Sequence, residues 1–280
     1  MFFHQLKGEL WKLFGKKRTY IGFSMFVLAQ LLIILLLRYF PPAHRSLMNN
    51  IRRTGFPVEG YISMLTVASL MVMVMAYTLL PLYVALIGGD LVSKEAEEGT
   101  LRMILSRPVS RARLICLKWL AGLIFSCLLV LALGASCLFF CAIWFPVHGG
   151  LFAQIPDVGV VLADFQNGLT HYVAAHAVMI AKACTIMSLA FMLSCFNMKP
   201  AAATILALSL ILIDRILMEI PYFQDFKEYF LSYHLNVWQT LFLDPVPWWR
   251  VGEALSVMAG ASITFLIIGL AAFHARDIKS

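Results

Sequence analysis

Residues 114–144 read LICLKWLAGLIFSCLLVLALGASCLFFCAIW and are almost entirely apolar. The run is continuously apolar instead of alternating, which is typical of a helix in lipid and not of a barrel strand. Lipid offers the backbone no hydrogen-bond partners, so a chain that crosses it must form helices or a closed barrel. The stretch therefore predicts a transmembrane helix, long enough that it must tilt or emerge from the bilayer.

The composition of the whole chain agrees with this prediction. Of 280 residues, 61% are hydrophobic and 13% are charged, and the mean hydropathy is +0.84. So little polar surface cannot coat a soluble globule. The net charge of +7 could suggest nucleic acid, but most basic residues flank apolar runs instead of gathering on a soluble surface. We therefore expect an all-α polytopic membrane protein that contacts membrane lipids and no nucleic acid.

Six apolar runs are each close to the length that a hydrocarbon core requires, roughly 20 residues. We place the spans at residues 19–37, 62–88, 114–144, 174–197, 201–217 and 253–273. Residues 1–280 then form a single transmembrane domain with both termini on one side of the membrane. Pro81 removes a helical hydrogen bond and predicts a kink near the inner end of the second span.

The distribution of basic residues assigns both termini to the cytoplasm, because most lysines and arginines then lie in cytoplasmic segments. Four arginines in the first outer loop go against the rule. Two long outer segments, residues 145–172 and 218–250, are aromatic and contain prolines. Tyrosine and tryptophan prefer the headgroup level, so we expect interfacial or re-entrant helices in both.

Residues 1–18 have an amphipathic pattern at a period of 3.6 residues. The apolar side consists of Phe3, Leu6, Leu10, Leu13 and Phe14, and the polar side of Gln5, Glu9, Lys12 and Lys16. This pattern predicts an elbow helix that lies in the inner membrane interface and turns at Gly15 into the first span. The alternative is a longer first helix that simply protrudes.

The segment between spans two and three, residues 89–113, has the signals of a structured protrusion. Gly99 can end one helix in the left-handed conformation, and Thr100 can cap the short helix that follows. Pro108 ends that helix, and Ser110 can cap the helix that enters the third span. A compact helix-turn-helix on the cytoplasmic side suits docking to a partner.

Several motifs in this order carry a family resemblance. They are Glu97-Glu98-Gly99-Thr100-Leu101, Leu105-Ser106-Arg107-Pro108-Val109-Ser110-Arg111, Lys118, Ser232-Tyr233-His234-Leu235 and the ending Phe273-His274-Ala275-Arg276-Asp277-Ile278. With the six-span layout, the sequence resembles the type-2 ABC transporter permeases, the membrane subunits of a group of ATP-binding-cassette exporters. The resemblance covers essentially the whole chain.

This resemblance implies a permease subunit that forms the translocation pathway with a second protomer, as a homodimer or heterodimer, and binds two copies of a cytosolic ABC ATPase. Coupling to the ATPase would fall on Glu97, Glu98, Gly99, Thr100 and Arg102. The chain contains no GxxxxGK[ST] loop, so the partner would bind ATP and magnesium and hydrolyse the ATP. We expect no cofactor in this chain, no catalytic residues, and an exporter in a bacterial inner membrane.

Lys182 lies inside the fourth apolar run, where a lysine costs roughly 2.5 to 3.5 kcal/mol on insertion scales. Either it faces inward as part of a pathway, or it lies close to the outer surface and its ammonium snorkels to water. His171 and His176 do not share a helix face, which argues against a metal site. Cys137 and Cys141 do share a face, but cysteines are ordinary packing residues in apolar runs.

Two other functions fit parts of the sequence. A membrane sensor or scaffold coupled to an ATPase would have every feature described above. An intramembrane enzyme would need a nucleophile or metal motif, and the sequence contains neither HExxH nor GxSxG.

Overall fold

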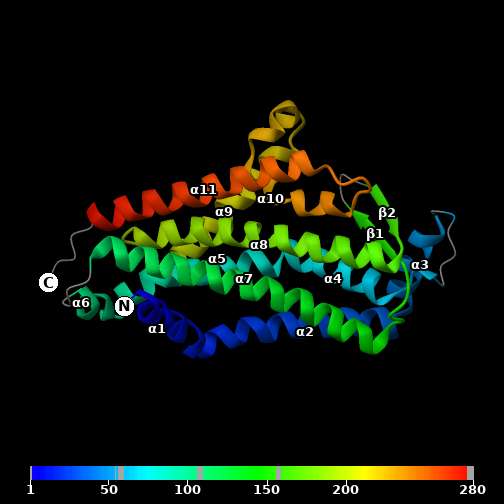
Figure 1. The fold of residues 1–280 in the computed structure, drawn as a ribbon, viewed down its shortest axis with the longest axis horizontal. Coiled ribbons are helices and arrows are strands. Elements are labelled where there is room, and N and C mark those ends of the chain that lie inside the picture. Colours follow the sequence, from blue (N-terminus) through cyan, green and yellow to red (C-terminus); the bar gives the residue numbers. More distant parts are fainter. Residues whose placement is uncertain (1, 54, 56–59, 106–109, 156–158, 276–280) are drawn as a thin grey trace.

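The computed structural model describes residues 2–53, 55, 60–105, 110–155 and 159–275. Most of them form helices that run along one long axis of an elongated bundle (Figure 1). The elements are α1 (Phe2–Gly15), α2 (Lys17–Tyr39), α3 (Pro41–Arg52), α4 (Met64–Tyr77), α5 (Leu79–Glu97), α6 (Thr100–Leu105), α7 (Arg111–Trp144), β1 (Leu151–Ile155), β2 (Gly159–Ala163), α8 (Phe165–Cys195), α9 (Pro200–Glu219), the 3-10 helix η2 (Pro221–Tyr229), α10 (Leu231–Leu235), the 3-10 helix η3 (Val237–Phe242) and α11 (Trp248–Ala275).

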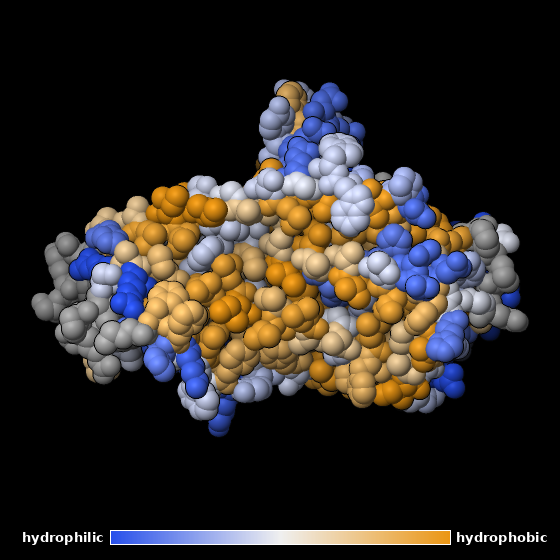
Figure 2. Space-filling model, viewed as in Figure 1, coloured by the Kyte–Doolittle hydropathy of each residue, from blue (hydrophilic) through white to orange (hydrophobic). Residues whose placement is uncertain are grey.

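The helices confirm an all-α polytopic membrane protein. In the part of the chain that the structure describes, α2, α7, α8, α9 and α11 are each long and apolar enough to cross a membrane, and the bent pair of α4 and α5 meets the same test when taken together as one broken span. Figure 2 shows apolar side chains over much of the long side of the bundle. Such a surface is expected where lipid replaces water as the solvent.

The second span is broken where a proline disrupts it. Pro81 lies in the first turn of α5, and in an unbroken helix its ring would clash with the carbonyl group of Tyr77, four residues earlier. Helix α4 ends at Tyr77, Thr78 lies outside both helices, and α4 and α5 meet at an angle of 43°. The break lies near the middle of the span and not near its inner end, because α5 continues to Glu97.

Helix α8 forms the centre of the bundle and packs against α5, α7 and α11. Among the five spans made of a single helix, α8 is the most buried and α9 is the least buried. Gly88 lets α5 approach α8 closely, since an added Cβ atom would lie 2.6 Å from the Met187 carbonyl oxygen. Small residues at such crossings are the usual means by which membrane helices pack.

The two ends of the bundle differ (Figure 1). Helix α6, the start of α1 and the end of α11 lie at one end, which we call the α6 end. Helix α3 and the strands lie at the other, which we call the hairpin end. An even number of spans requires that the chain enter and leave the bundle at the same end.

Strands β1 and β2 pair antiparallel, with Leu151 opposite Ala163. The Thr66 hydroxyl oxygen in α4 accepts a hydrogen bond from the Phe152 backbone N–H at 2.9 Å. The expectation of helices in residues 145–172 is therefore wrong for the hairpin. Both strands are short and mostly apolar, and periodicity alone cannot tell such a run from a piece of helix.

Residues 218–250 form short helices, of which only some return to the bundle. The 3-10 helix η2 has no buried residues and belongs to the hydrophilic projection on the side of the molecule (Figures 1 and 2). Helix α10 and the 3-10 helix η3 instead pack against α8 and α11. Trp238 in η3 is fully buried, so this part of the segment contributes to the core.

Candidate functional site

The turn between α5 and α6 is built by local signals. Gly99 has φ +74°, the left-handed conformation that the sequence predicts for it. The Glu98 backbone N–H donates to the Lys94 carbonyl oxygen at 2.9 Å and completes the last turn of α5. The Thr100 hydroxyl donates to the Glu95 carbonyl oxygen at 3.3 Å. Thr100 therefore closes the end of α5, and α6 begins at once.

The residues proposed for coupling lie together at this turn. Glu97 and Glu98 are exposed, whereas Leu101 is 2% exposed and holds α6 against the bundle. Arg102 lies in α6. Pro108, expected to end this helix, lies outside the residues that the structure describes. The turn presents its two carboxylates outward from a fixed base.

Helix α7 begins close to the end of α11. The Ser110 hydroxyl oxygen accepts a hydrogen bond from the Arg113 backbone N–H at 3.3 Å, the cap expected from the sequence. The Arg111 guanidinium donates to the His274 carbonyl oxygen at 3.4 Å. The α6 end therefore joins the third span to the last one.

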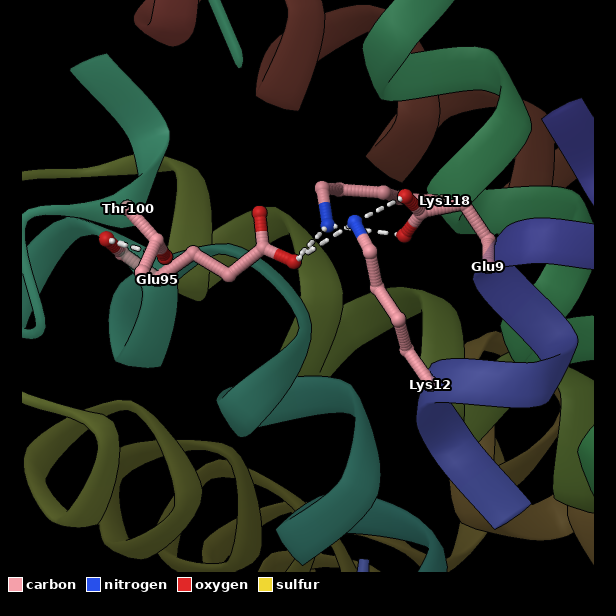
Figure 3. Close-up of polar contacts among 5 residues, drawn as sticks. All are labelled: Glu9, Lys12, Glu95, Thr100 and Lys118. Atoms are coloured by element: carbon pink, nitrogen blue, oxygen red, sulfur yellow. Dashed lines mark hydrogen bonds and ion pairs between the residues drawn. The ribbon is translucent and has the colours of Figure 1, made fainter. Parts of the chain in front are cut away.

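Four charged side chains form a cluster directly beside the α5–α6 turn (Figure 3). We call Glu9, Lys12, Glu95 and Lys118 the ion cluster. Lys118 Nζ lies 2.9 Å from Glu9 Oε2 and 2.7 Å from Glu95 Oε1. Lys12 Nζ lies 2.6 Å from Glu9 Oε1 and 3.6 Å from Glu95 Oε1. Two cations and two carboxylates thus join α1, α5 and α7.

The charges in the ion cluster stabilise one another against burial. Lys118 is 1% exposed. Burial would raise the pKa of Glu9, but the nearby ammonium groups of Lys118 and Lys12 outweigh it and hold that pKa below 4.5. Burial would lower the pKa of Lys12, and its bonds to Glu9 and Glu95 instead raise that pKa. Breaking such a pair leaves a buried unpaired charge, which is strongly destabilising.

A second ion pair links the start of α2 to α5. Arg18 Nη1 lies 2.8 Å from Asp90 Oδ2, and 46% of the arginine side chain is exposed. The Tyr83 hydroxyl in α5 donates to the Thr19 carbonyl oxygen in α2. Helix α5 is therefore tied to the first span as well as to α1 and α7.

A groove of about 790 Å³ lies between α1 and the α5–α6 turn. Trp11 and Met103 line it and are 77% and 66% exposed. Glu98 and Thr100 also line it, together with Glu9 of the ion cluster. Exposed large apolar side chains beside carboxylates are typical of a protein-docking surface with apolar anchors and a polar rim.

Lys182 lies in a different region, near the middle of α8. It is 4% exposed, and its Nζ donates to Asn236 Oδ1 at 3.2 Å. Asn236 immediately precedes η3, so the ammonium group lies inside the bundle against the returning segment. The structure thus brings Glu97 to Arg102 together and leaves Lys182 apart from them.

The histidines and cysteines weighed as metal ligands lie among packed helices. His171 Nδ1 donates to the Leu241 carbonyl oxygen at 2.6 Å, and His176 Nδ1 donates to the Tyr172 carbonyl oxygen at 2.8 Å. Cys141 Sγ lies 3.7 Å from Met71 Sδ. Within the described ranges, no three His, Cys, Asp or Glu residues form a group that could hold a metal ion.

The sequence analysis missed the ion cluster. It placed Glu9 and Lys12 on a polar helix face and used Lys118 only as part of a motif. One signal was present, because Lys118 is the single charge in the apolar run of residues 114–144. A lysine in such a run is usually paired or functional, and Glu9 and Glu95 are the acids that pair with this one.

Comparison with known proteins identifies a family over a range that contains the α5–α6 turn. No curated protein matches the sequence. The sequence model described as ABC-2 family transporter protein matches residues 15–234, from the start of the first span to α10. That match includes the six motif positions Glu97 to Arg102 and the broken second span. The chain therefore belongs to the ABC-2 transporter family and is the permease of an ATP-binding-cassette transporter.

Proposed function

We propose that the chain exports its substrate and couples this transport to ATP hydrolysis by a separate ATPase that docks at the α6 end. The observation that carries the proposal is the ion cluster beside the docking groove. A partner that fills the groove touches α1 through Trp11 and α6 through Met103. Glu9 lies in α1 itself, and Glu95 lies at the end of α5, which the turn joins to α6.

The proposed docking contacts combine shape and charge. Glu97 and Glu98 project from the turn, and complementary basic groups on an ATPase would pair with them. Charged rims of this kind steer association and set the register of two proteins. Gly99 and Thr100 hold the turn in shape, and Arg102 completes the motif.

Movement at the turn would reach the spans through the ion cluster. Lys118 holds both Glu9 and Glu95, so a shift of the α5 end acts on α1 and α7 at the same time. The break at Thr78 separates α5 from α4, so the half of the span nearest the turn can tilt with less resistance. ATP-driven closure would then shift the populations of inward-facing and outward-facing states.

The assembly in this proposal contains two permease protomers and two ATPase subunits in a bacterial inner membrane, with both termini and α6 in the cytoplasm. ATP and magnesium bind only to the ATPase. The mass of the complex purified in lipid tests this stoichiometry. A mass that fits one permease chain per complex would contradict it.

The coupling site is tested by the double change Glu97→Ala, Glu98→Ala in the permease co-expressed with its ATPase. The purified complex should lose ATPase subunits, or keep them and lose at least about tenfold in substrate-dependent ATP turnover, since each lost charged contact costs about 1 kcal/mol or more. The matched control is Asp225→Ala, Glu228→Ala, which removes two exposed acids from η2. Equal assembly and turnover in both variants would exclude coupling at the turn.

A further inference from the structure

A cavity of about 480 Å³ lies inside the bundle, where α4 and α5 break. Its walls come from that break, α8, α9 and the segment that leads into η3. Most of the lining is apolar, and the side chains that make this surface are Pro81, Leu82, Ile186, Leu208, Ile211 and Leu212. Leu82 and Leu212 are 47% and 57% exposed, so the cavity opens on the side of the bundle that faces the bilayer or a neighbouring chain.

Two cations line this apolar cavity. Lys182 Nζ lies 5.0 Å from the centre of the Tyr77 ring and 5.9 Å from that of Trp238. The Arg215 guanidinium lies 4.4 Å from the centre of the same Tyr77 ring. The Tyr77 ring therefore lies beside both a lysine and an arginine, and these three residues line the cavity, whereas Trp238 does not.

Neither cation has a carboxylate partner among the residues that the structure describes. The ion pairs found there join other lysines and arginines. Asp214, next to Arg215 in sequence, accepts hydrogen bonds from the backbone N–H groups of Leu231 and Ser232 at 3.3 and 2.6 Å. Its carboxylate is thus engaged at the start of α10.

The cations are only partly compensated by their neighbours. Lys182 has one neutral acceptor, Asn236 Oδ1, and cation–π contacts are weaker than a buried ion pair. A buried charge inside a membrane bundle is costly and is usually paired or part of a functional site. An anion between Lys182 and Arg215 would supply the missing negative charge.

A second cavity, of about 590 Å³, adjoins the first and shares Tyr77, Arg215 and Asn236 with it. It is more polar, and its lining adds Lys227 and Arg250. It also contains one acid, Glu219. The two cavities together offer an apolar compartment, a cationic junction and a polar compartment beside residues 218–250.

We propose that this paired cavity binds an amphiphile with a single anionic head and an apolar tail. The head lies between Lys182 and Arg215, and the tail lies along Leu208 and Leu212 of α9. The assignment of this ligand as the transported substrate rests on the proposed function. Binding itself does not, because every contact comes from the permease chain.

The test uses the full-length permease alone in nanodiscs of zwitterionic phosphatidylcholine. Laurate and phosphatidylglycerol are titrated in separate experiments, with lysophosphatidylcholine and inorganic phosphate as controls for the tail and the head. Binding of laurate or phosphatidylglycerol supports the site, and the two arms distinguish a free single-chain anion from a membrane lipid. Equal binding of lysophosphatidylcholine, or binding of phosphate with no preference for an amphiphile, would overturn it.

Variants locate the binding. Lys182→Met should raise the dissociation constant about tenfold or more, because a charge-assisted hydrogen bond is lost. Lys182→Arg keeps the charge and should stay within about threefold of the wild type. Lys199→Met is the matched control, since Lys199 is exposed at the start of α9 and outside both cavities. Unchanged affinity in a folded Lys182→Met, Arg215→Gln variant would disprove the site, whereas failed ATPase coupling would leave it intact.

Discussion

Two lysines lie in apolar spans of this protein and are almost equally buried, at 1% exposed for Lys118 and 4% for Lys182. Lys118 lies between two carboxylates from different helices. Lys182 meets an amide oxygen and two aromatic rings. Burial alone therefore does not reveal what a charged residue does in a membrane bundle. The partners of the charged residue show whether it holds helices together, as Lys118 does, or can bind an external anion, as we propose for Lys182.

The largest expected effect of a single substitution is that of Lys118→Met. It leaves Glu9 and Glu95 as buried carboxylates with only Lys12 near them, so the free energy of unfolding should fall by about 3 to 5 kcal/mol. Lys182→Met removes a buried cation that has no carboxylate partner and should leave that free energy unchanged or raise it. Unfolding of the purified permease in mixed micelles measures both.

A further change sharpens this test. Adding Glu95→Gln to Lys118→Met removes one of the two uncompensated carboxylates and should recover part of the lost stability. If Lys118→Met and Lys182→Met instead have equal effects, the contrast between the two lysines is wrong.

An intermediate effect is expected for Glu9→Gln. The free energy of unfolding should fall by roughly 1 to 3 kcal/mol at neutral pH, because Lys118 and Lys12 each lose a charged acceptor. The pKa of Glu9 is lower in the folded protein than its ordinary value of 4.5. The contribution of the ionised Glu9 to the free energy of unfolding is therefore fully present above pH 4.5. It is lost as the pH falls through the pKa that Glu9 has in the folded protein. Unfolding measured from pH 7 to pH 3 should bring the wild type and Glu9→Gln together at the acid end.

A matched variant checks that this convergence belongs to the ion cluster. Asp225→Asn neutralises an exposed acid in η2 and should leave the wild-type pH dependence as it is. A difference between wild type and Glu9→Gln that stays constant down to pH 3 would contradict the role of the ionised Glu9.

The smallest effect is expected for Arg18→Gln. Its partner Asp90 is mostly buried, but 46% of the arginine side chain is exposed, so solvent screens the pair. The free energy of unfolding should change by about 0 to 1 kcal/mol, and added salt should reduce the difference further. If Arg18→Gln lowered the free energy of unfolding as much as Lys118→Met, solvent exposure would not determine how much each ion pair contributes to stability.

The features predicted correctly depend on local chemistry. Pro81 breaks its helix wherever the helix packs, and Gly99 adopts its left-handed turn for reasons contained in a few residues. The hairpin of β1 and β2 depends instead on the hydroxyl groups of Ser63 and Thr66, which bind Gly150 and Phe152 from far along the chain. The local periodicity of the sequence does not indicate these long-range hydrogen bonds.

The start of α8 was also missed for this reason. The span was expected to begin at residue 174, after a separate interfacial segment, yet α8 runs without a break from Phe165. Tyr172 is buried there, and its hydroxyl donates to the Gly134 carbonyl oxygen of α7 at 3.0 Å. Tertiary contacts extend the helix beyond what its hydropathy predicts.

The proposed coupling residues were accessible from sequence because Glu97 to Arg102 are consecutive. The ion cluster was not, since Glu9 and Lys118 are 109 positions apart. A lysine in an apolar run is usually paired or functional, but only the packing of α1 against α7 shows which acid pairs with Lys118. Long-range charge pairing is therefore the part of the site that required a structure.

The ion cluster contains two positive and two negative side chains. Moving one net elementary charge across a membrane at 100 mV involves about 2.3 kcal/mol of electrical work. A group of four charges that sums to zero and moves as a unit transfers none. A movement of the ion cluster as a unit would thus add no electrical work of its own to a rearrangement at this end of the permease.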